Sequence, residues 1–92
     1  MALEEILESG NYTLIDVREP MELEMDGEIE GAVNIPLGEV EERRGEIERM
    51  EGAKVFFCRS GNRSGKAVDF FKNLGRDDVY NGGGFQELAG KL

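Results

Sequence analysis

A short apolar run ends in the chain's only cysteine and leads at once into a turn and a helical pattern. Residues 55–57 are all apolar, as is typical of a short strand buried in a core, and Cys58 follows them. Residues 60–62 favour turn conformations, and apolar side chains then recur at helical spacing over 63–74. We therefore expect a strand over 54–58, a loop and a helix, which requires a fold whose helices pack on a sheet.

Helical and strand-like patterns alternate along the rest of the chain. Pro20 suits the first turn of a helix, and Ile35 is biased away from helix by the proline after it. We expect helices over 2–9, 20–25, 37–50 and 85–92, and further strands over 12–18, 32–35 and 79–81. Strands joined through helices cannot pair as tight hairpins. The sequence therefore predicts an α/β fold, with a mostly parallel central sheet of four to five strands and helices on both faces.

The expected position of Cys58 favours a reactive thiol. Ligands bind beyond the carboxyl ends of parallel strands, and Cys58, Asp16 and Arg18 all fall at that edge. Loop N–H groups and a helix start would converge on the sulfur, with added positive charge from Arg59, Arg63 and Lys66. Such surroundings lower a cysteine pKa and favour the thiolate. The alternative is a cysteine that merely fills the core, which would not need a glycine-containing turn flanked by arginines.

Composition excludes several kinds of site. The chain has no histidine and one cysteine, which excludes the usual Cys/His zinc site, an intramolecular disulfide and every Ser-His or Cys-His catalytic pair. The carboxylates within 19–30 are spaced too irregularly for a calcium loop, and the glycines at 82–84 do not form a nucleotide-binding motif. We read the former as a solvated face, and we expect the latter to let the backbone turn close to the cysteine loop. We expect neither a metal nor a cofactor.

Length and charge limit the organisation and the partners. The 92 residues suit one domain, 1–92, with a modest core. A net charge of −9 argues against nucleic acid or an anionic membrane as the main partner. The acidic start of the chain is unlike a signal peptide, and no apolar run approaches membrane-spanning length. We therefore expect a cytoplasmic protein, in a reducing compartment that suits a free thiol.

Four stretches of the chain resemble motifs of the rhodanese family of sulfurtransferases, specifically its single-domain members. They are LIDVREPME at 14–22, similar to D-V-R-x-x-x-E; GEIEGAVNIP at 27–36, similar to G-H-I-x-G-A-x-N-I-P; CRSGNRS at 58–64, similar to the active-site loop C-x-x-G-x-R-S; and GGF at 83–85, similar to a closing double-glycine motif. Glu28 stands where the family usually has histidine, and Leu88 where an aromatic residue is common. Both departures concern local packing and partner docking.

The resemblance implies a rhodanese-like fold and a thiosulfate sulfurtransferase. Cys58 would take the outer sulfur of thiosulfate or a persulfide donor, become a persulfide, and pass the sulfur to cyanide, a small thiol, thioredoxin or a sulfur-acceptor protein. The active-site loop that binds the substrate would consist of Arg59, Ser60, Gly61, Asn62, Arg63 and Ser64. Asp16 and Arg18 would support this loop, and Arg18 would pair with Glu22 one helical turn later.

Two other readings stay open. A phosphatase or arsenate reductase uses a related loop with the spacing C-x5-R, but here Arg63 is the fifth residue after Cys58 and Ser64 is the sixth. The shorter loop makes a smaller cradle, better matched to one sulfur atom than to a tetrahedral oxyanion. A persulfide carrier or protein-binding module with little activity on small molecules would carry the same loop, so the cysteine and arginines alone do not exclude it.

Overall fold

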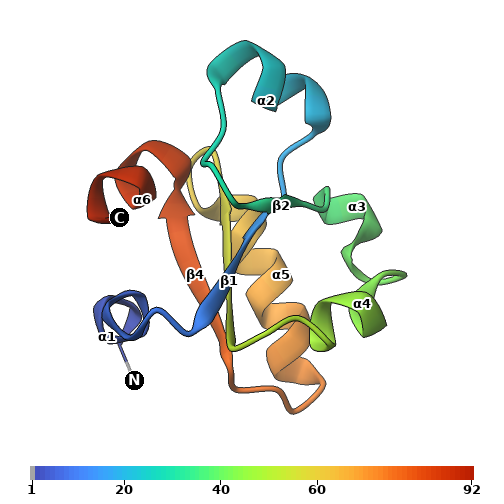
Figure 1. Ribbon diagram of the computed structural model, residues 1–92. Helices are drawn as coiled ribbons and strands as arrows, with labels where there is room; N and C mark the ends of the chain where they lie inside the picture. The colour runs from blue at the N-terminus through green and yellow to red at the C-terminus, as the bar shows by residue number, and fades with distance from the viewer. Residues whose placement is uncertain (1) are drawn as a thin grey trace.

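A four-stranded parallel sheet forms the centre of the computed structural model, which describes residues 2–92 (Figure 1). Its strands are β1 (Tyr12–Asp16), β2 (Val33–Asn34), β3 (Ala53–Cys58) and β4 (Val79–Gly84). They lie in the order β2-β1-β3-β4, and each neighbouring pair is parallel. The predicted α/β fold with a mostly parallel sheet is therefore confirmed, with four strands.

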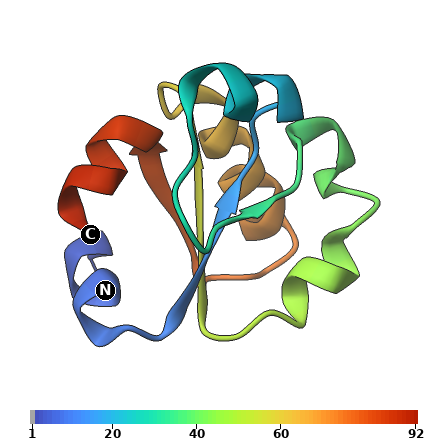
Figure 2. The same cartoon turned by 45° about the horizontal axis from the view of Figure 1, so that its top comes forward.

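Helices cover both faces of this sheet, as the two ribbon views show (Figures 1 and 2). One face carries α1 (Leu3–Ser9) and α6 (Phe85–Lys91). The other carries α3 (Leu37–Val40), α4 (Arg44–Glu48) and α5 (Asn62–Asn73). The remaining helix, α2 (Pro20–Asp26), buries none of its residues and lies above the carboxyl ends of the strands (Figure 2). It is therefore placed to contact the loops at that edge rather than the core.

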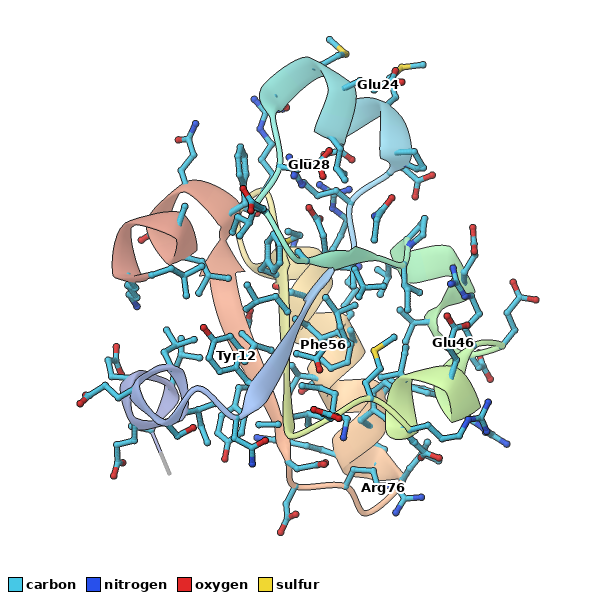
Figure 3. All side chains as sticks on the ribbon, viewed as in Figure 1. Tyr12, Glu24, Glu28, Glu46, Phe56 and Arg76 are labelled. Carbon is cyan, nitrogen blue, oxygen red and sulfur yellow. The ribbon has the colours of Figure 1, made fainter. Side chains whose placement is uncertain are left out.

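Strand β3 joins the two halves of the core. Val55 and Phe57 pack in the cluster under α1 and α6, whereas Phe56 and Cys58 pack in the cluster under α5. Successive side chains of a strand point to opposite faces, so a strand covered on both faces needs an unbroken apolar run. Phe56 stacks on Phe71 of α5 with 5.5 Å between the ring centroids, near the centre of the molecule (Figure 3). This packing holds the end of β3 firmly in place.

Two predicted elements differ from the structure. The single helix expected over 37–50 is wrong, because α3 and α4 are separated by a turn at 41–43. No apolar residue lies between Val40 and Ile47, so the middle of the expected helix has nothing to bury against the sheet. The glycines at 82–84, expected as a turn, instead continue β4 through a bulge opposite Phe56 and Phe57.

The other predicted boundaries agree with the structure to within two residues. The glycines also bring two backbones together, as the sequence predicted, because a Cβ at Gly84 would lie 2.6 Å from the carbonyl oxygen of Arg59. No helix within residues 2–92 has the length and apolarity that crossing a membrane requires.

Candidate active site

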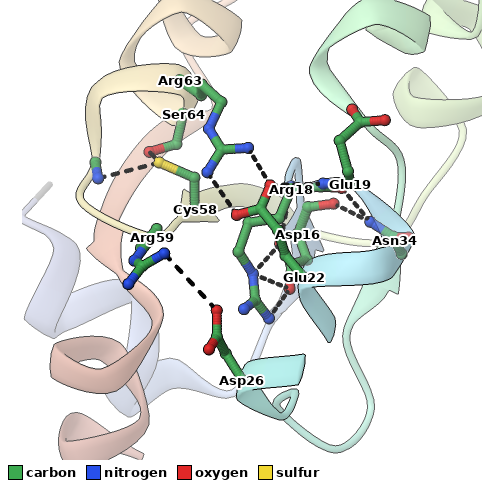
Figure 4. A network of polar contacts seen from close by, with 11 residues as sticks. Asp16, Arg18, Glu19, Glu22, Asp26, Asn34, Cys58, Arg59, Arg63 and Ser64 are labelled. Atoms are coloured by element: carbon green, nitrogen blue, oxygen red, sulfur yellow. Dashed lines mark hydrogen bonds and ion pairs between the residues drawn. The ribbon is translucent and has the colours of Figure 1, made fainter. Parts of the chain in front are cut away.

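Cys58 ends β3 at the carboxyl edge of the sheet, where the sequence placed it, and its side chain is fully buried. The loop that follows turns back through Gly61, whose φ of +97° is left-handed, and α5 begins at the next residue. The N–H of Gly61 donates to Cys58 Sγ at 3.0 Å (Figure 4). A side chain would be strained at this φ, and its Cβ would lie 3.2 Å from Gly83 Cα. Glycine therefore allows the loop to close over the sulfur.

A second group reaches the sulfur from the first turn of α5. Ser64 is buried, and its Oγ lies 3.5 Å from Cys58 Sγ. The same oxygen lies 2.7 Å from Oδ1 of Asn81, a β4 residue that the sequence analysis did not single out. Asn81 also donates through Nδ2 to the carbonyl of Gly61 at 3.1 Å. Its position directly before three glycines was the available signal, but the bonds themselves depend on β4 lying beside the loop.

These contacts change the acidity of the thiol. Burial raises the pKa of the Cys58 thiol, but the Ser64 hydroxyl and the backbone N–H groups of residues 60, 61 and 64 lower it by more, so the pKa lies below its ordinary value. The cations Arg59, Arg63 and Lys66 were also expected from the sequence to lower this pKa. The largest lowering causes are instead the hydroxyl and the N–H groups. The site therefore favours a thiolate through uncharged hydrogen-bond donors.

Carboxylates of α2 engage both loop arginines (Figure 4). Arg63 forms a bidentate pair with Glu22, at 2.6 and 2.9 Å. Hydrogen bonding from Arg63 lowers the pKa of Glu22 to about 2. Arg59 remains 69% exposed and lies 4.0 Å from Asp26. Glu22 and Asp26 are one turn apart on α2 and so face the loop together.

The ion pair predicted between Arg18 and Glu22 is wrong. Arg18 pairs with Asp16 instead, with Nη2–Oδ2 at 2.7 Å, and both side chains are buried. Its Nη2 also donates to the Gly27 carbonyl at 2.9 Å, and the guanidinium stacks on the ring of Phe85 at 4.1 Å. Hydrogen bonding to Asp16 raises the pKa of Arg18. Glu22 lies instead against the loop, where both of its carboxylate oxygens accept from Arg63.

The two remaining predicted loop residues, Ser60 and Asn62, differ in their relation to the sulfur. Ser60 supplies one of the N–H groups near the sulfur, and Asn62 starts α5 with an exposed side chain. Asp16 ends β1, Arg18 lies two residues beyond it, and both are buried. Their role in supporting the loop stays a prediction. Within residues 2–92 no group of three cysteine, aspartate or glutamate side chains is placed to hold a metal ion.

Comparison with known proteins places this geometry in a family. Residues 2–91 match the rhodanese-like domain. The chain belongs to the rhodanese family. This confirms the resemblance that the four motifs indicated, and the rhodanese fold accounts for the position of the cysteine loop at the carboxyl edge of the sheet.

Individual relatives cover most of the chain. "Thiosulfate sulfurtransferase PspE" of Escherichia coli is 36% identical over 77 residues, which cover 82% of this chain and 72% of PspE. "Uncharacterized protein YqhL" of Bacillus subtilis is 42% identical over 80 residues, covering 86% of this chain and 62% of YqhL. The chain thus spans less than two thirds of YqhL. The solved structure of the human single-domain sulfurtransferase TSTD1 is 31% identical, with a TM-score of 0.73 over 98% of this chain and 91% of TSTD1.

Proposed function

We propose that this rhodanese is a sulfurtransferase that moves a sulfane sulfur from thiosulfate or a similar donor to cyanide or a thiol, through a persulfide on Cys58. The observation that carries the proposal is the buried Cys58 sulfur, held 3.0 Å from the Gly61 N–H and 3.5 Å from the Ser64 hydroxyl. The names of PspE and TSTD1 support the same class of reaction. One domain over residues 1–92 and a cytoplasmic location stay part of this proposal.

The reaction needs no titrating base. The Cys58 thiolate attacks the outer sulfur of thiosulfate, the sulfur–sulfur bond of the donor breaks, and sulfite leaves with its electron pair. The terminal sulfur of the resulting persulfide carries the negative charge. Cyanide or a thiolate then attacks that terminal sulfur, and Cys58 leaves as a thiolate. Preorganised N–H donors around the sulfur stabilise it as nucleophile and again as leaving group.

The two loop arginines have different freedom to bind a donor. Arg63 already makes two hydrogen bonds to Glu22, whereas Arg59 is exposed and only distantly paired with Asp26. We therefore assign Arg59 to the sulfonate group of the donor, through charge-assisted hydrogen bonds. Arg63 instead anchors α2 to the loop.

The same pairing favours a second candidate function. Carboxylates offset both loop arginines, and the whole chain carries a net charge of −9, so a small dianion is attracted weakly. A persulfide carrier that exchanges sulfur with protein thiols would not have to attract a small dianion. A phosphatase or arsenate reductase is less well supported, because the Arg63 guanidinium is bound to Glu22 and the loop is one residue shorter than C-x5-R.

Intact-mass analysis after mixing with thiosulfate tests the proposal directly. We expect the protein to gain one sulfur atom and to release thiocyanate when cyanide is added, and we expect Cys58→Ser to do neither, because a serine hydroxyl stays protonated in the same cradle. Sulfur loading with little thiocyanate would instead support the carrier. No sulfur gain by the unmodified protein, or an active Cys58→Ser variant, would contradict the mechanism. Hydrolysis of p-nitrophenyl phosphate that depends on Cys58 would favour the phosphatase.

A further inference from the structure

Asn81 connects β4 to the cysteine loop through both ends of its amide. Its Oδ1 accepts from the Gly83 N–H at 2.9 Å and lies 2.7 Å from Ser64 Oγ. Its Nδ2 donates to the Gly61 carbonyl at 3.1 Å. These partners fix the orientation of the amide, because a backbone N–H requires an acceptor and a carbonyl requires a donor. The atom facing Ser64 is therefore an acceptor.

The Ser64 hydroxyl consequently has two acceptors for one proton. It can donate to Asn81 Oδ1 at 2.7 Å or to Cys58 Sγ at 3.5 Å, but not to both. While it donates to Asn81, its oxygen can still accept from a Cys58 S–H. A thiolate has no proton to donate and is itself an acceptor. It is therefore stabilised most when the Ser64 hydroxyl donates to it.

We propose that the Ser64 hydroxyl alternates between Asn81 Oδ1 and Cys58 Sγ as the charge on the sulfur changes, with Asn81 as the positioning residue of this two-position hydrogen bond. Only the O–H direction changes. No covalent bond forms or breaks, and the thiol proton is lost to solvent. Asn81 Oδ1 keeps the Gly83 N–H when the hydroxyl turns away, so it is never left without a donor.

The alternation matches the proposed sulfur-transfer cycle, and in this respect it rests on the proposed function. Cys58 Sγ is charged as a thiolate and uncharged as the inner sulfur of a persulfide. The hydroxyl would face the sulfur in the first state and Asn81 in the second. The direction of the Ser64 O–H dipole thus changes with the charge on Cys58 Sγ, and no proton is transferred.

Other charged groups near the sulfur lie on different elements. Arg63 of α5 interacts electrostatically with the Cys58 thiolate, and Glu22 of α2 and Asp16 of β1 act on the same guanidinium. Arg59 lies in the loop and faces Asp26. A substitution at Asn81 on β4 leaves all of these groups in place. The acidity of Cys58 in such variants therefore reports on the hydrogen bonds that Asn81 makes.

The pH dependence of Cys58 alkylation by iodoacetamide tests the proposal in the full chain. Asn81→Ala removes the competing acceptor, so the midpoint should move to lower pH. Asn81→Asp supplies a stronger, charged acceptor, so the midpoint should move to higher pH. Each shift should be roughly one pH unit, the size expected for one hydrogen bond to a charged group. Asn73→Asp, at the opposite end of α5, is the matched control and should leave the midpoint unchanged.

A Ser64→Ala background separates this role from a merely structural one. In that background Asn81→Ala should no longer shift the midpoint of Cys58 alkylation. Asn81→Asp should still raise the midpoint, but only by the smaller amount that its negative charge causes. Both Asn81 variants are checked by near-ultraviolet circular dichroism and thermal unfolding. Loosening of the loop would move the midpoint in the same direction in both variants. Shifts of the same sign, or an Asn81→Ala shift that persists in Ser64→Ala, would overturn the proposal.

Discussion

At the scale of single residues, the surroundings of Arg59 and Arg63 give two similar side chains different roles. Two short hydrogen bonds to Glu22 hold Arg63, with 32% of its side chain exposed. Arg59 is 69% exposed and has one long contact, to Asp26. Sequence position alone would assign both arginines to the donor. The structure leaves Arg59 as the one with free hydrogen-bonding capacity.

Arg59→Ala should therefore weaken donor binding without unfolding the protein. We expect the KM for thiosulfate to rise about tenfold, as for the loss of one hydrogen bond to a charged group, with a much smaller change in kcat. Steady-state thiocyanate formation measures both constants, and Arg76→Ala, an exposed arginine before β4, is the control. An unchanged KM with a reduced kcat would show that Arg59 does not bind the donor.

At the scale of elements, helix α2 is held by ion pairs rather than by apolar burial. None of its residues is buried, and Met21 and Met25 are exposed. Glu24 also points away from the sheet (Figure 3), and Glu28 just beyond the helix is exposed. The Glu22–Arg63 pair is thus a main tie between α2 and α5. Loss of this tie should loosen α2 and leave the core intact.

Glu22→Gln should lower stability in a pH-dependent way. The pKa of Glu22 is lowered to about 2 by its hydrogen bonds with Arg63, from an ordinary value of 4.5. A lowered folded-state pKa means that the stabilisation is present above pH 4.5 and is lost as the pH falls toward 2. We expect the variant to be less stable by about 1 kcal/mol at pH 7, a modest value because the pair is partly exposed to solvent.

Urea unfolding of both proteins at pH 7 and at pH 2.5 measures this difference. The difference in the free energy of unfolding between the two proteins should be smaller at the lower pH, where Glu22 begins to be protonated in the folded protein. The control is Glu24→Gln, because the Glu24 carboxylate is exposed on the same helix. Its free energy of unfolding should differ little from that of the unmodified protein at either pH. If the difference in the free energy of unfolding is equally large at both pH values, the ion pair does not cause it.

At the scale of the whole molecule, the buried Asp16–Arg18 pair joins segments far apart in the chain. Arg18 follows β1, bonds to Gly27 beyond α2, and stacks on Phe85 at the start of α6. Asn34 of β2 adds hydrogen bonds to the carbonyls of Asp16 and Arg18, each at 2.9 Å. The buried pair is therefore surrounded by β2, by the segment after α2 and by the start of α6.

Arg18→Met should be strongly destabilising. Removal of one partner leaves the other charge buried without compensation, which costs about 3–5 kcal/mol. We expect the double variant Asp16→Leu/Arg18→Met to recover part of this loss, because neither charge is then buried. Urea unfolding gives the free energies for the single and double variants. Purely additive effects of the two substitutions would contradict a coupled pair.

Much of the site could be predicted from the sequence because its chemistry is local. The apolar run before Cys58, the turn residues after it and the helical pattern beyond are contiguous, and each depends on short-range conformational preferences. The α/β alternation follows from the same patterns. Together with the spacing of four motifs, these features predicted the family, the sheet edge that carries the site and the position of the cysteine.

Only the tertiary structure decided which side chains meet around that cysteine. Glu22 and Arg63 are 41 positions apart, and Ser64 and Asn81 are 17 apart. Their contacts exist because the strand order β2-β1-β3-β4 puts β3 between β1 and β4, so helix α2 after β1 and Asn81 of β4 both reach the segment that follows Cys58. An ion pair chosen by sequence spacing, Arg18 with Glu22, was wrong for this reason. Local preferences shape a segment, whereas its partners are determined by how all the segments pack together.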